Sequence, residues 1–450
     1  MISNSKIKIC SPINNQKERE YILTTLFCDF LGIPVQISFE NRIDYKLVIN
    51  NCIIFVHDDF FNRNELPLSY LKKENIPQII NYQKLLNVEI PLIWGNEKFT
   101  FNDEEIYIGN DFFATAFFFL TQWEEYVLKV DKGLSIRDKI DENLLFIIRN
   151  RLQKKCLVND ILEFLKELLE KCGLKQFRTH HFDVMLTHDV DRCFLSSYEE
   201  LCDNINQMLE MGANERAQRI LSDYISYKKQ GSNPFDSFDE LMDISDQYGF
   251  KNHFYFKPCM IGDEGFTYSL NDNFVVKVIK NILTRGHYIG LHATENTSHS
   301  YKALKMENER LKGISGCAIN GGRTHCLIYS PDVFRNLDRL GLLYDSGVGF
   351  QYYNGFRSSV CYPYPIFCIP ERKKLHLKEY PFMVMDSVST RNEMNAEDFF
   401  KDIISVMDTV KKYDGLLVTN WHSNMFNTKG REKFKKVYRM MVEYSSKIMG

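Results

Sequence analysis

The sequence predicts an α/β fold in which a parallel sheet or barrel occupies the C-terminal two thirds of the chain. Three observations lead to this prediction. Short apolar runs alternate with longer amphipathic stretches after residue 182. Several of these runs end directly in charged or histidine side chains, as strands do at the active face of barrel enzymes. The length of 450 residues exceeds what one hydrophobic core usually supports, so a second domain is expected.

The first part of the chain is predicted to form a smaller α/β domain over residues 1–175. Short apolar runs between turn residues indicate strands, and wider apolar periodicity indicates helices. The predicted elements are strands at 33–39, 46–50 and 52–56 and helices at 111–126 and 142–172. No residues here predict a chemical role, so this domain is expected to shape or cover an active-site cleft, or to mediate assembly.

The second domain is predicted over residues 182–450, after a polar junction at 173–181. It opens with a buried strand at 184–187, which is followed by a helical insertion at about 195–229. The further predicted elements are strands at 253–256, 287–292 and 416–421 and helices at 237–248, 273–285, 330–340 and 395–412. Alternation of this kind is typical of a parallel sheet or barrel.

Composition excludes some classes of partner. The net charge is -3 and no Lys/Arg-rich tract is present, so nucleic acid is not expected as a partner. No apolar run approaches the roughly 18 residues of a membrane span, and the N-terminus lacks a secretory signal. The 12 cysteines form no CxxC pair. We therefore expect a cytoplasmic protein with reduced thiols and no transmembrane segment.

Two aspartates follow the first strand of the second domain. Asp189 and Asp191 are two residues apart, so in an extended chain both carboxylates face the same side. Two carboxylates at that spacing repel each other unless a cation or an acid–base task separates their roles. The pair alone is a weak signal, because aspartates also cap helices and fill turns.

Histidines and an arginine follow later strands. His292 ends one strand, and a helix starting there would place Asn296 on the same face, with His299 three residues further on. Arg323 and His325 lie on a loop loosened by two glycines, where a guanidinium is suited to orienting a carboxylate. His422 ends the last strong strand, and histidine is the usual proton donor near neutral pH.

Taken in order, these pieces resemble the polysaccharide deacetylases, the NodB-like carbohydrate esterases of family four. The resemblance covers about residues 183–425. A closer likeness is to a cytoplasmic branch found with surface-polysaccharide clusters in gut-type bacteria. Residues 114–126 also resemble the preceding domain of that branch, so this likeness extends weakly over most of the chain. The segments that carry this likeness are LTHDVD at 186–191, GLHATEN at 290–296, RTH at 323–325, DSGVGF at 345–350, GFR at 355–357, CYPY at 361–364 and WH at 421–422.

The resemblance implies a fold and a set of roles. The fold would be a distorted (β/α) barrel of the NodB type, preceded by the smaller α/β domain. The implied roles are Asp189 as base, Asp191 and His292 as metal ligands, Arg323 as the residue that holds the base, and His422 as general acid. The cofactor would be a divalent metal, zinc first, with cobalt, nickel, manganese or iron as alternatives.

One departure from the family concerns the third metal ligand. Asn296 stands where the family has a second histidine, and an amide is a weaker ligand than imidazole for zinc-like ions. His325 or His299 could supply the missing nitrogen, and His325 is favoured because it shares a short loop with Arg323. The family's usual R-x-P pattern is also replaced, since Thr324 and His325 follow the arginine.

The function implied is metal-dependent removal of an N-acetyl group from an amino sugar in surface-polysaccharide or glycoconjugate biosynthesis. The partner would be an N-acetylated sugar or glycoconjugate precursor, such as a nucleotide sugar or a lipid-linked intermediate. Two alternatives stay open: an amidohydrolase of the same fold acting on a non-sugar amide, and a sugar-binding protein that has lost its chemistry. The oligomeric state is also left open.

Overall fold

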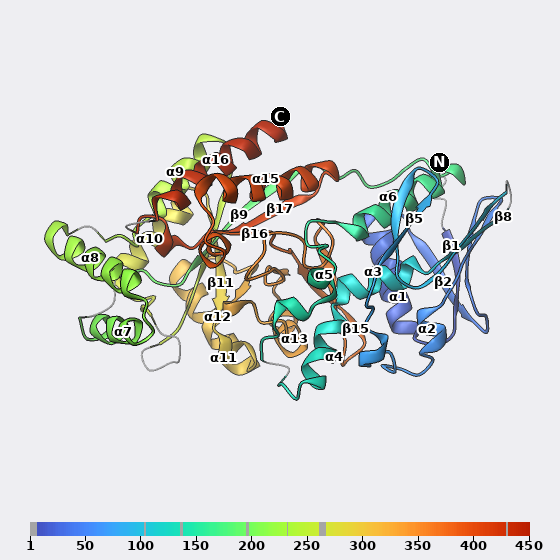
Figure 1. Ribbon diagram of the computed structural model, residues 1–450, viewed down its shortest axis with the longest axis horizontal. Helices are drawn as coiled ribbons and strands as arrows, with labels where there is room; N and C mark the ends of the chain where they lie inside the picture. Colours follow the sequence, from blue (N-terminus) through green and yellow to red (C-terminus); the bar gives the residue numbers. More distant parts are fainter. Residues whose placement is uncertain are drawn as a thin grey trace.

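The computed structural model describes residues 7–102, 105–135, 138–194, 198–231, 233–260, 267–428 and 431–450. Two large sheets organise the chain, each with helices packed against it, so the fold is mixed α/β (Figure 1). Residues 7–110 build the first sheet and residues 183–420 build the second.

The first sheet has six strands in the order β2-β1-β3-β4-β8-β7, and a hairpin of β5 and β6 lies beside it. Its strands are β1 (Ile7–Pro12), β2 (Val35–Glu40), β3 (Tyr45–Ile49), β4 (Cys52–Val56), β7 (Gly95–Phe101) and β8 (Glu105–Asn110), and the hairpin strands are β5 (Asn81–Leu85) and β6 (Val88–Leu92). The strands predicted at 46–50 and 52–56 are confirmed as the antiparallel pair β3–β4. Both alternate buried and half-buried positions, which is the period expected of a strand.

Left-handed residues divide the predicted helices of this part. The helix predicted at 111–126 is two helices, because Gln122 has a φ of 48° and stops the first one. The region predicted at 142–172 is likewise broken, with Arg151 at a φ of 56° before its long last helix. The elements are α1 (Gln16–Thr24), η1 (Thr25–Phe30), α2 (Phe60–Arg63), η2 (Lys73–Asn75), α3 (Phe112–Thr121), α4 (Trp123–Asp131), η3 (Glu142–Leu144), α5 (Phe146–Arg149) and α6 (Leu157–Lys171).

The second sheet is curled like half of a barrel and has nine strands in the order β14-β15-β13-β12-β11-β10-β9-β17-β16. All neighbouring strands are parallel except β14 and β15. The strands are β9 (Asp183–Val190), β10 (Asn252–Phe256), β11 (Tyr288–Ala293), β12 (Gly321–Thr324), β13 (Tyr344–Asp345), β14 (Tyr364–Cys368), β15 (Lys373–Glu379), β16 (Val384–Met385) and β17 (Leu416–Asn420). Parallel pairing brings the carboxyl ends of these strands to one edge.

The helices predicted at 237–248, 273–285, 330–340 and 395–412 are confirmed to within a residue or two, whereas α12 and α16 were not predicted. The elements are α7 (Tyr198–Glu210), α8 (Asn214–Gln230), α9 (Phe238–Gln247), α10 (Asn273–Thr284), α11 (Glu295–Ser298), α12 (Tyr301–Ser315), η4 (His325–Leu327), α13 (Pro331–Leu340), α14 (Ser387–Arg391), α15 (Ala396–Lys412), η5 (Ser423–Met425) and α16 (Glu432–Met449). In Figure 1, α7 and α8 lie together at the end of the molecule farthest from the first sheet. None of the described helices combines the length and apolar character needed to cross a bilayer.

The two parts of the chain share one hydrophobic core. Helices α1 and α3 pack against β15 and β14 of the second sheet. The Tyr21 hydroxyl donates to the carbonyl of Pro365 at 2.9 Å, and the Tyr21 ring lies 4.9 Å from that of Phe367. Arg372 donates from Nε and Nη2 to both carboxylate oxygens of the buried Glu18, each at 2.7 Å. The first sheet and its helices therefore cover one margin of the second.

A buried carboxyl pair, Asp345 and Glu379, lies across the parallel strands β13 and β15. Burial raises the pKa of Asp345 to about 6, and burial together with Asp345 raises the pKa of Glu379 well above its usual range. A carboxyl whose pKa is raised by folding stabilises the folded state below its ordinary pKa. That contribution is lost as the pH rises through the folded-state value.

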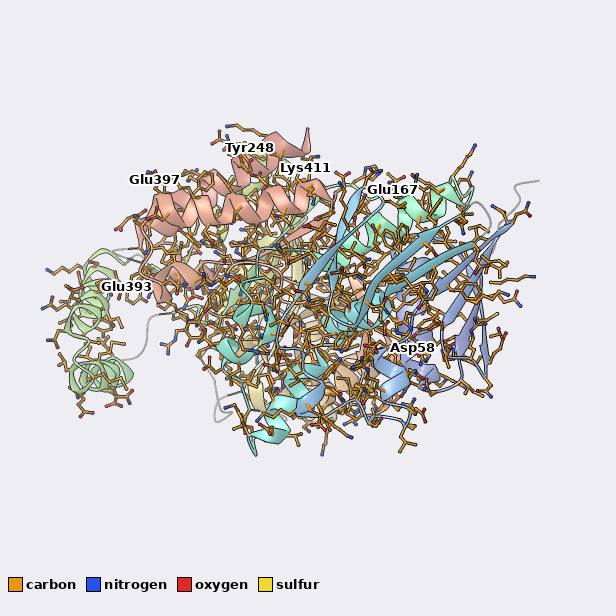
Figure 2. The ribbon with its side chains drawn as sticks, turned by 45° about the vertical axis from the view of Figure 1, so that its right-hand side comes forward. Asp58, Glu167, Tyr248, Glu393, Glu397 and Lys411 are labelled. Atoms are coloured by element: carbon orange, nitrogen blue, oxygen red, sulfur yellow. The ribbon has the colours of Figure 1, made fainter. Side chains whose placement is uncertain are left out.

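We expect the free energy of unfolding of Glu379→Gln, measured relative to that of wild type, to increase by on the order of 1 kcal/mol as the pH rises from about 5 to about 8. The amide has no proton to lose, so the variant avoids the loss of stability that the paired carboxyls cause. Urea unfolding at both pH values measures it. Glu397→Gln, on the exposed surface of α15 (Figure 2), is the matched control. Parallel pH profiles of Glu379→Gln and wild type would contradict the expectation.

Candidate active site

Six of the residues singled out from the sequence meet at the carboxyl edge of the second sheet. They line or support a cavity of about 260 Å³. Asp189 is the last residue but one of β9, and Asp191 follows that strand. His292 is in β11, Arg323 is in β12 with His325 directly after it, and His422 comes two residues after β17. Because these four strands are parallel, residues far apart in the sequence converge at one place.

Asp189 is held from both sides. Its Oδ1 accepts from Arg323 Nη1 at 2.8 Å, and its Oδ2 accepts from Asn420 Nδ2 at 2.8 Å. Arg323 is fixed in turn by bonds from Nη2 to the hydroxyls of Thr187 and Ser346, each at 3.0 Å. Burial would raise the pKa of Asp189, but the Arg323 charge and the nearby histidines lower it to about 2. Asp189 is therefore an ionised, fixed carboxylate at neutral pH.

Asp191, His292 and His325 form a cluster in which one ligand atom of each lies within 4.8 Å of the others. His292 Nε2 is 3.3 Å from Asp191 Oδ1, and His325 Nε2 is 3.6 Å from the same oxygen. The other ring nitrogen of His292, Nδ1, lies 2.9 Å from the Arg323 carbonyl and is the donor there when the ring is neutral. That tautomer turns a lone pair of Nε2 toward a carboxylate oxygen, which is an unfavourable contact without a cation between them.

Two atoms of this cluster support a metal site. Among the described residues, the buried His292 Nε2 has no hydrogen-bond partner, and Asp191 Oδ1 has ion-pair contacts but no hydrogen bond. One carboxylate oxygen and two imidazole nitrogens are a ligand set of catalytic zinc and of other first-row metals. The residues present therefore fit a divalent metal, and their chemistry does not choose among the candidate ions.

Lys257 is a member of the site that the sequence reading did not single out. Its Nζ lies 3.0 Å from Asp191 Oδ1, and its side chain is 5% exposed. Burial would raise the pKa of Asp191, but the neighbouring His292 and the Lys257 charge hold it well below its usual range. The signal available in the sequence was position, since Lys257 is the first residue after β10, as Asp191 is the first after β9.

No helix starts at His292, so His292 and Asn296 do not share a helix face as expected. Strand β11 runs on to Ala293, and the short helix α11 begins only at Glu295, so His292 points from a strand and not from a helix. The side chain of Asn296 lies outside the described residues. The residue that joins Asp191 and His292 in the cluster is His325, which was favoured over His299.

His422 is oriented by a second residue that the sequence reading missed. Asp386 is fully buried just after β16, and its Oδ1 lies 2.7 Å from His422 Nδ1 while its Oδ2 accepts from the His422 backbone N–H at 2.8 Å. Burial would lower the pKa of His422, but Asp386 outweighs it and raises the pKa to about 9. His422 Nε2 lies 3.8 Å from Asp191 Oδ2, so a protonated imidazole faces the cluster.

One family model matches the first part of the chain, and several solved structures are distantly similar to part of it. Residues 7–173 match a family of unknown function, DUF7033. No curated protein matches the chain.

Solved structures with partial similarity include three bacterial or archaeal proteins. One is a protein from Mycobacterium smegmatis provisionally designated a polysaccharide deacetylase, with 14% identity, 61% of this chain and 86% of that chain covered, and a TM-score of 0.40. A second, from Bordetella bronchiseptica, is provisionally designated a polysaccharide deacetylase involved in O-antigen biosynthesis, with 15% identity, 58% and 81% covered, and a TM-score of 0.32. A third is the 4-α-glucanotransferase of Thermococcus litoralis, with 11% identity, 58% and 37% covered, and a TM-score of 0.35.

Proposed function

We propose that this protein is a metal-dependent hydrolase that removes an N-acetyl group from an amino sugar in surface-polysaccharide or glycoconjugate biosynthesis. One observation carries the proposal: an ionised carboxylate, Asp189, and a protonated imidazole, His422, line the same cavity as the Asp191–His292–His325 cluster. A fixed base, a fixed acid and a cation site are the parts that hydrolysis of an amide requires. The ordered motifs that resemble the polysaccharide deacetylases supply the same assignment independently.

Asp191, His292 and His325 would hold the metal. When bound, a divalent cation polarises a carbonyl oxygen and lowers the pKa of water. The imidazole of His292 is preset for this task, because the contact of its Nδ1 with the Arg323 carbonyl leaves Nε2 directed at the cluster.

Asp189 would accept the proton of the attacking water. Arg323 and Asn420 occupy one direction at each carboxylate oxygen, and each oxygen retains a further lone pair to accept a proton. Because the Arg323 charge keeps the pKa of Asp189 at about 2, the carboxylate is free of its own proton at neutral pH. Its orientation is set before substrate enters, so the reaction does not have to supply the entropy of fixing this carboxylate in place.

His422 would protonate the leaving nitrogen. The amine of an amide is a poor leaving group unless it receives a proton, and His422 holds one on the side of Nε2 that faces the cavity. Asp386 fixes the ring and retains the proton through the contact at Nδ1.

The test of this proposal separates three functions with two measurements. Metal content of the purified protein is determined first, and release of acetate and of ammonia is then followed on N-acetylated sugars and on cyclic and linear amides. Acetate from an amino sugar supports the proposal. Ammonia, or turnover of non-sugar amides alone, identifies an amidohydrolase. Sugar binding with neither product identifies a protein without catalysis.

We expect Asp386→Asn to lower kcat/KM by roughly 10²–10³-fold at neutral pH, because His422 loses the carboxylate that orients it and holds its charge. The pKa of His422 is raised to about 9 by Asp386, so the acid form persists to alkaline pH in the wild type. Without that charge the pKa falls, and the alkaline limb of the pH–rate profile moves to lower pH. An unchanged limb would show that His422 does not act as the acid. Asp408→Asn on the exposed face of α15 is the control.

A further inference from the structure

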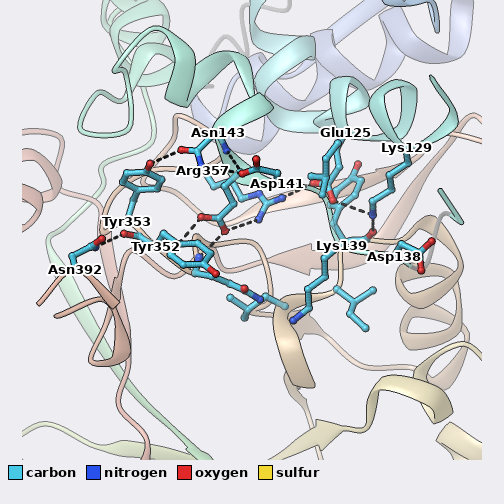
Figure 3. A pocket seen from close by; sticks show the side chains of 16 residues that line it. Glu125, Lys129, Asp138, Lys139, Asp141, Asn143, Tyr352, Tyr353, Arg357 and Asn392 are labelled. Carbon is cyan, nitrogen blue, oxygen red and sulfur yellow. Dashed lines mark hydrogen bonds and ion pairs between the residues drawn. The ribbon is translucent and has the colours of Figure 1, made fainter. Parts of the chain in front are cut away.

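A second cavity of about 600 Å³ adjoins the first, and the family of unknown function supplies much of its wall. The two cavities share Lys139, Leu327 and Gln351 as lining residues. From the first part of the chain come residues on α4 and the segment 138–143, and from the second part come 327–329, 351–353, Arg357 and Asn392 (Figure 3). Pockets of about 300–1,000 Å³ hold ligands larger than a single sugar unit.

Buried charges fix this wall. Glu142 Oε1 accepts from the backbone N–H of Gln351 at 2.6 Å, and Glu142 Oε2 accepts from that of Tyr352 at 3.2 Å. Arg357 Nη2 contacts Glu125 Oε2 at 2.5 Å, and Glu125 Oε1 lies 3.0 Å from Lys129 Nζ (Figure 3). The buried carboxylates are paired with cationic side chains or backbone N–H groups of the protein. They therefore hold the segment 138–143 against the loop 351–353 and leave recognition to the exposed groups.

The exposed groups suit a hydroxyl-rich ligand. Asp138, Asp141 and Asn143 are exposed and offer oxygen acceptors, and the Tyr353 hydroxyl donates to Asn143 Oδ1 at 2.8 Å. Tyr352 lines the second cavity, is 49% exposed and follows Gln351, which lines both cavities. Its ring is steadied by Arg391, whose guanidinium carbon lies 5.4 Å from the ring centroid. A steadied, half-exposed aromatic ring is a surface on which a sugar ring can pack.

The charge of the lining disfavours a phosphorylated ligand. It contains four acidic residues and three basic ones, which leaves a net charge of -1: Glu125, Asp138, Asp141 and Glu142 against Lys129, Lys139 and Arg357. A nucleoside diphosphate carries several negative charges and is bound through surplus cations or helix N-termini. An uncharged sugar chain needs neither.

We propose that the second cavity binds further sugar units of an uncharged oligosaccharide whose N-acetylated unit lies in the first cavity. The first part of the chain is then a substrate-binding wall, with Tyr352 as a specificity residue of the second cavity. This inference rests on the proposed function and deepens it, since it names an oligosaccharide in preference to a nucleotide sugar.

Binding of defined sugars to the full chain tests the inference without requiring turnover. Calorimetry compares N-acetylglucosamine with its β-1,4-linked trimer and pentamer and with UDP-N-acetylglucosamine, at low and high salt. We expect the pentamer to bind at least about tenfold more tightly than the monomer, with little dependence on salt. Tyr352→Ala should lose about tenfold in affinity for the pentamer and little for the monomer. Tyr288→Ala, 51% exposed at the opposite end of β11, should lose neither.

Failure of the inference and failure of the proposed function give different results. Equal binding of monomer and pentamer, no binding of any oligomer, or tighter and salt-sensitive binding of UDP-N-acetylglucosamine would overturn the inference, whether or not acetate is released. Length-dependent binding that Tyr352→Ala abolishes supports it. If no acetate appears in that case, the proposed hydrolysis is wrong while the binding site stands.

Discussion

Asp189→Asn should leave a folded protein that takes up as much metal as the wild type and turns over N-acetylated substrate about 10³-fold more slowly. The amide has nearly the shape of the carboxylate but cannot take a proton from water. Its oxygen can still accept from Arg323. The new side-chain nitrogen at position 189 would face Asn420 Nδ2, which is also a donor. A 180° flip of the Asn420 amide brings its Oδ1, which has no partner among the described residues, into place as the acceptor.

Initial rates, metal content and thermal unfolding of the same preparations measure this result. Asp183→Asn is the matched control, because Asp183 is the exposed first residue of the same strand, β9. A variant with wild-type kcat would exclude Asp189 as the base. A variant that also loses its metal would show that Asp189, rather than Asp191 alone, contributes to holding the ion.

Asp191→Ala should abolish stoichiometric metal uptake. Asp191 is the shared neighbour of His292 and His325, so its removal leaves two imidazoles with no anionic ligand. We expect affinity to fall by at least about 100-fold and the rise of Tm on addition of zinc to disappear. Metal analysis after dialysis and thermal unfolding with and without zinc measure both, and neither depends on activity.

The loss of Asp191 also leaves the Lys257 ammonium buried without its carboxylate, which can destabilise the fold for a different reason. Asp191→Ala/Lys257→Met removes both charges and separates the two effects. If the double variant is stable and still without metal, the cluster is the site. Retention of one equivalent of metal by either variant would place the ion elsewhere.

The proximity of Asp189, Asp191, His292 and His422 could be predicted because each ends an apolar run. Parallel strands bring such endings to one edge, so local pattern and one topological rule suffice. The third member of the cluster was left open between Asn296, His325 and His299. Which of the three joins the cluster depends on where β11 ends and α11 begins. Sequence pattern places such a boundary only to within a few residues.

Other parts of the site could not be predicted because their meaning lies in contacts distant along the chain. Lys257 and Asp386 are ordinary residues after short strands, and only the packing of β10 beside β9 and of β16 beside β17 gives them partners. The second cavity joins segments more than two hundred residues apart, as the contact of Glu142 with Tyr352 illustrates. The break of the predicted helix at Gln122 also follows from such packing, since its side-chain amide donates to Ser358.

Helices α1, α3 and η1 cover strands β14 and β15, so truncation of the first part of the chain would uncover this edge of the second sheet. β14 is the terminal strand of its sheet, and an uncovered terminal strand pairs readily with other chains. A fragment starting after residue 173 would expose that strand together with the apolar side chains of Phe367 and Tyr364. Such a fragment is expected to aggregate on expression, and exchange of the first part between related chains would succeed only if the β14–β15 hairpin were exchanged with it.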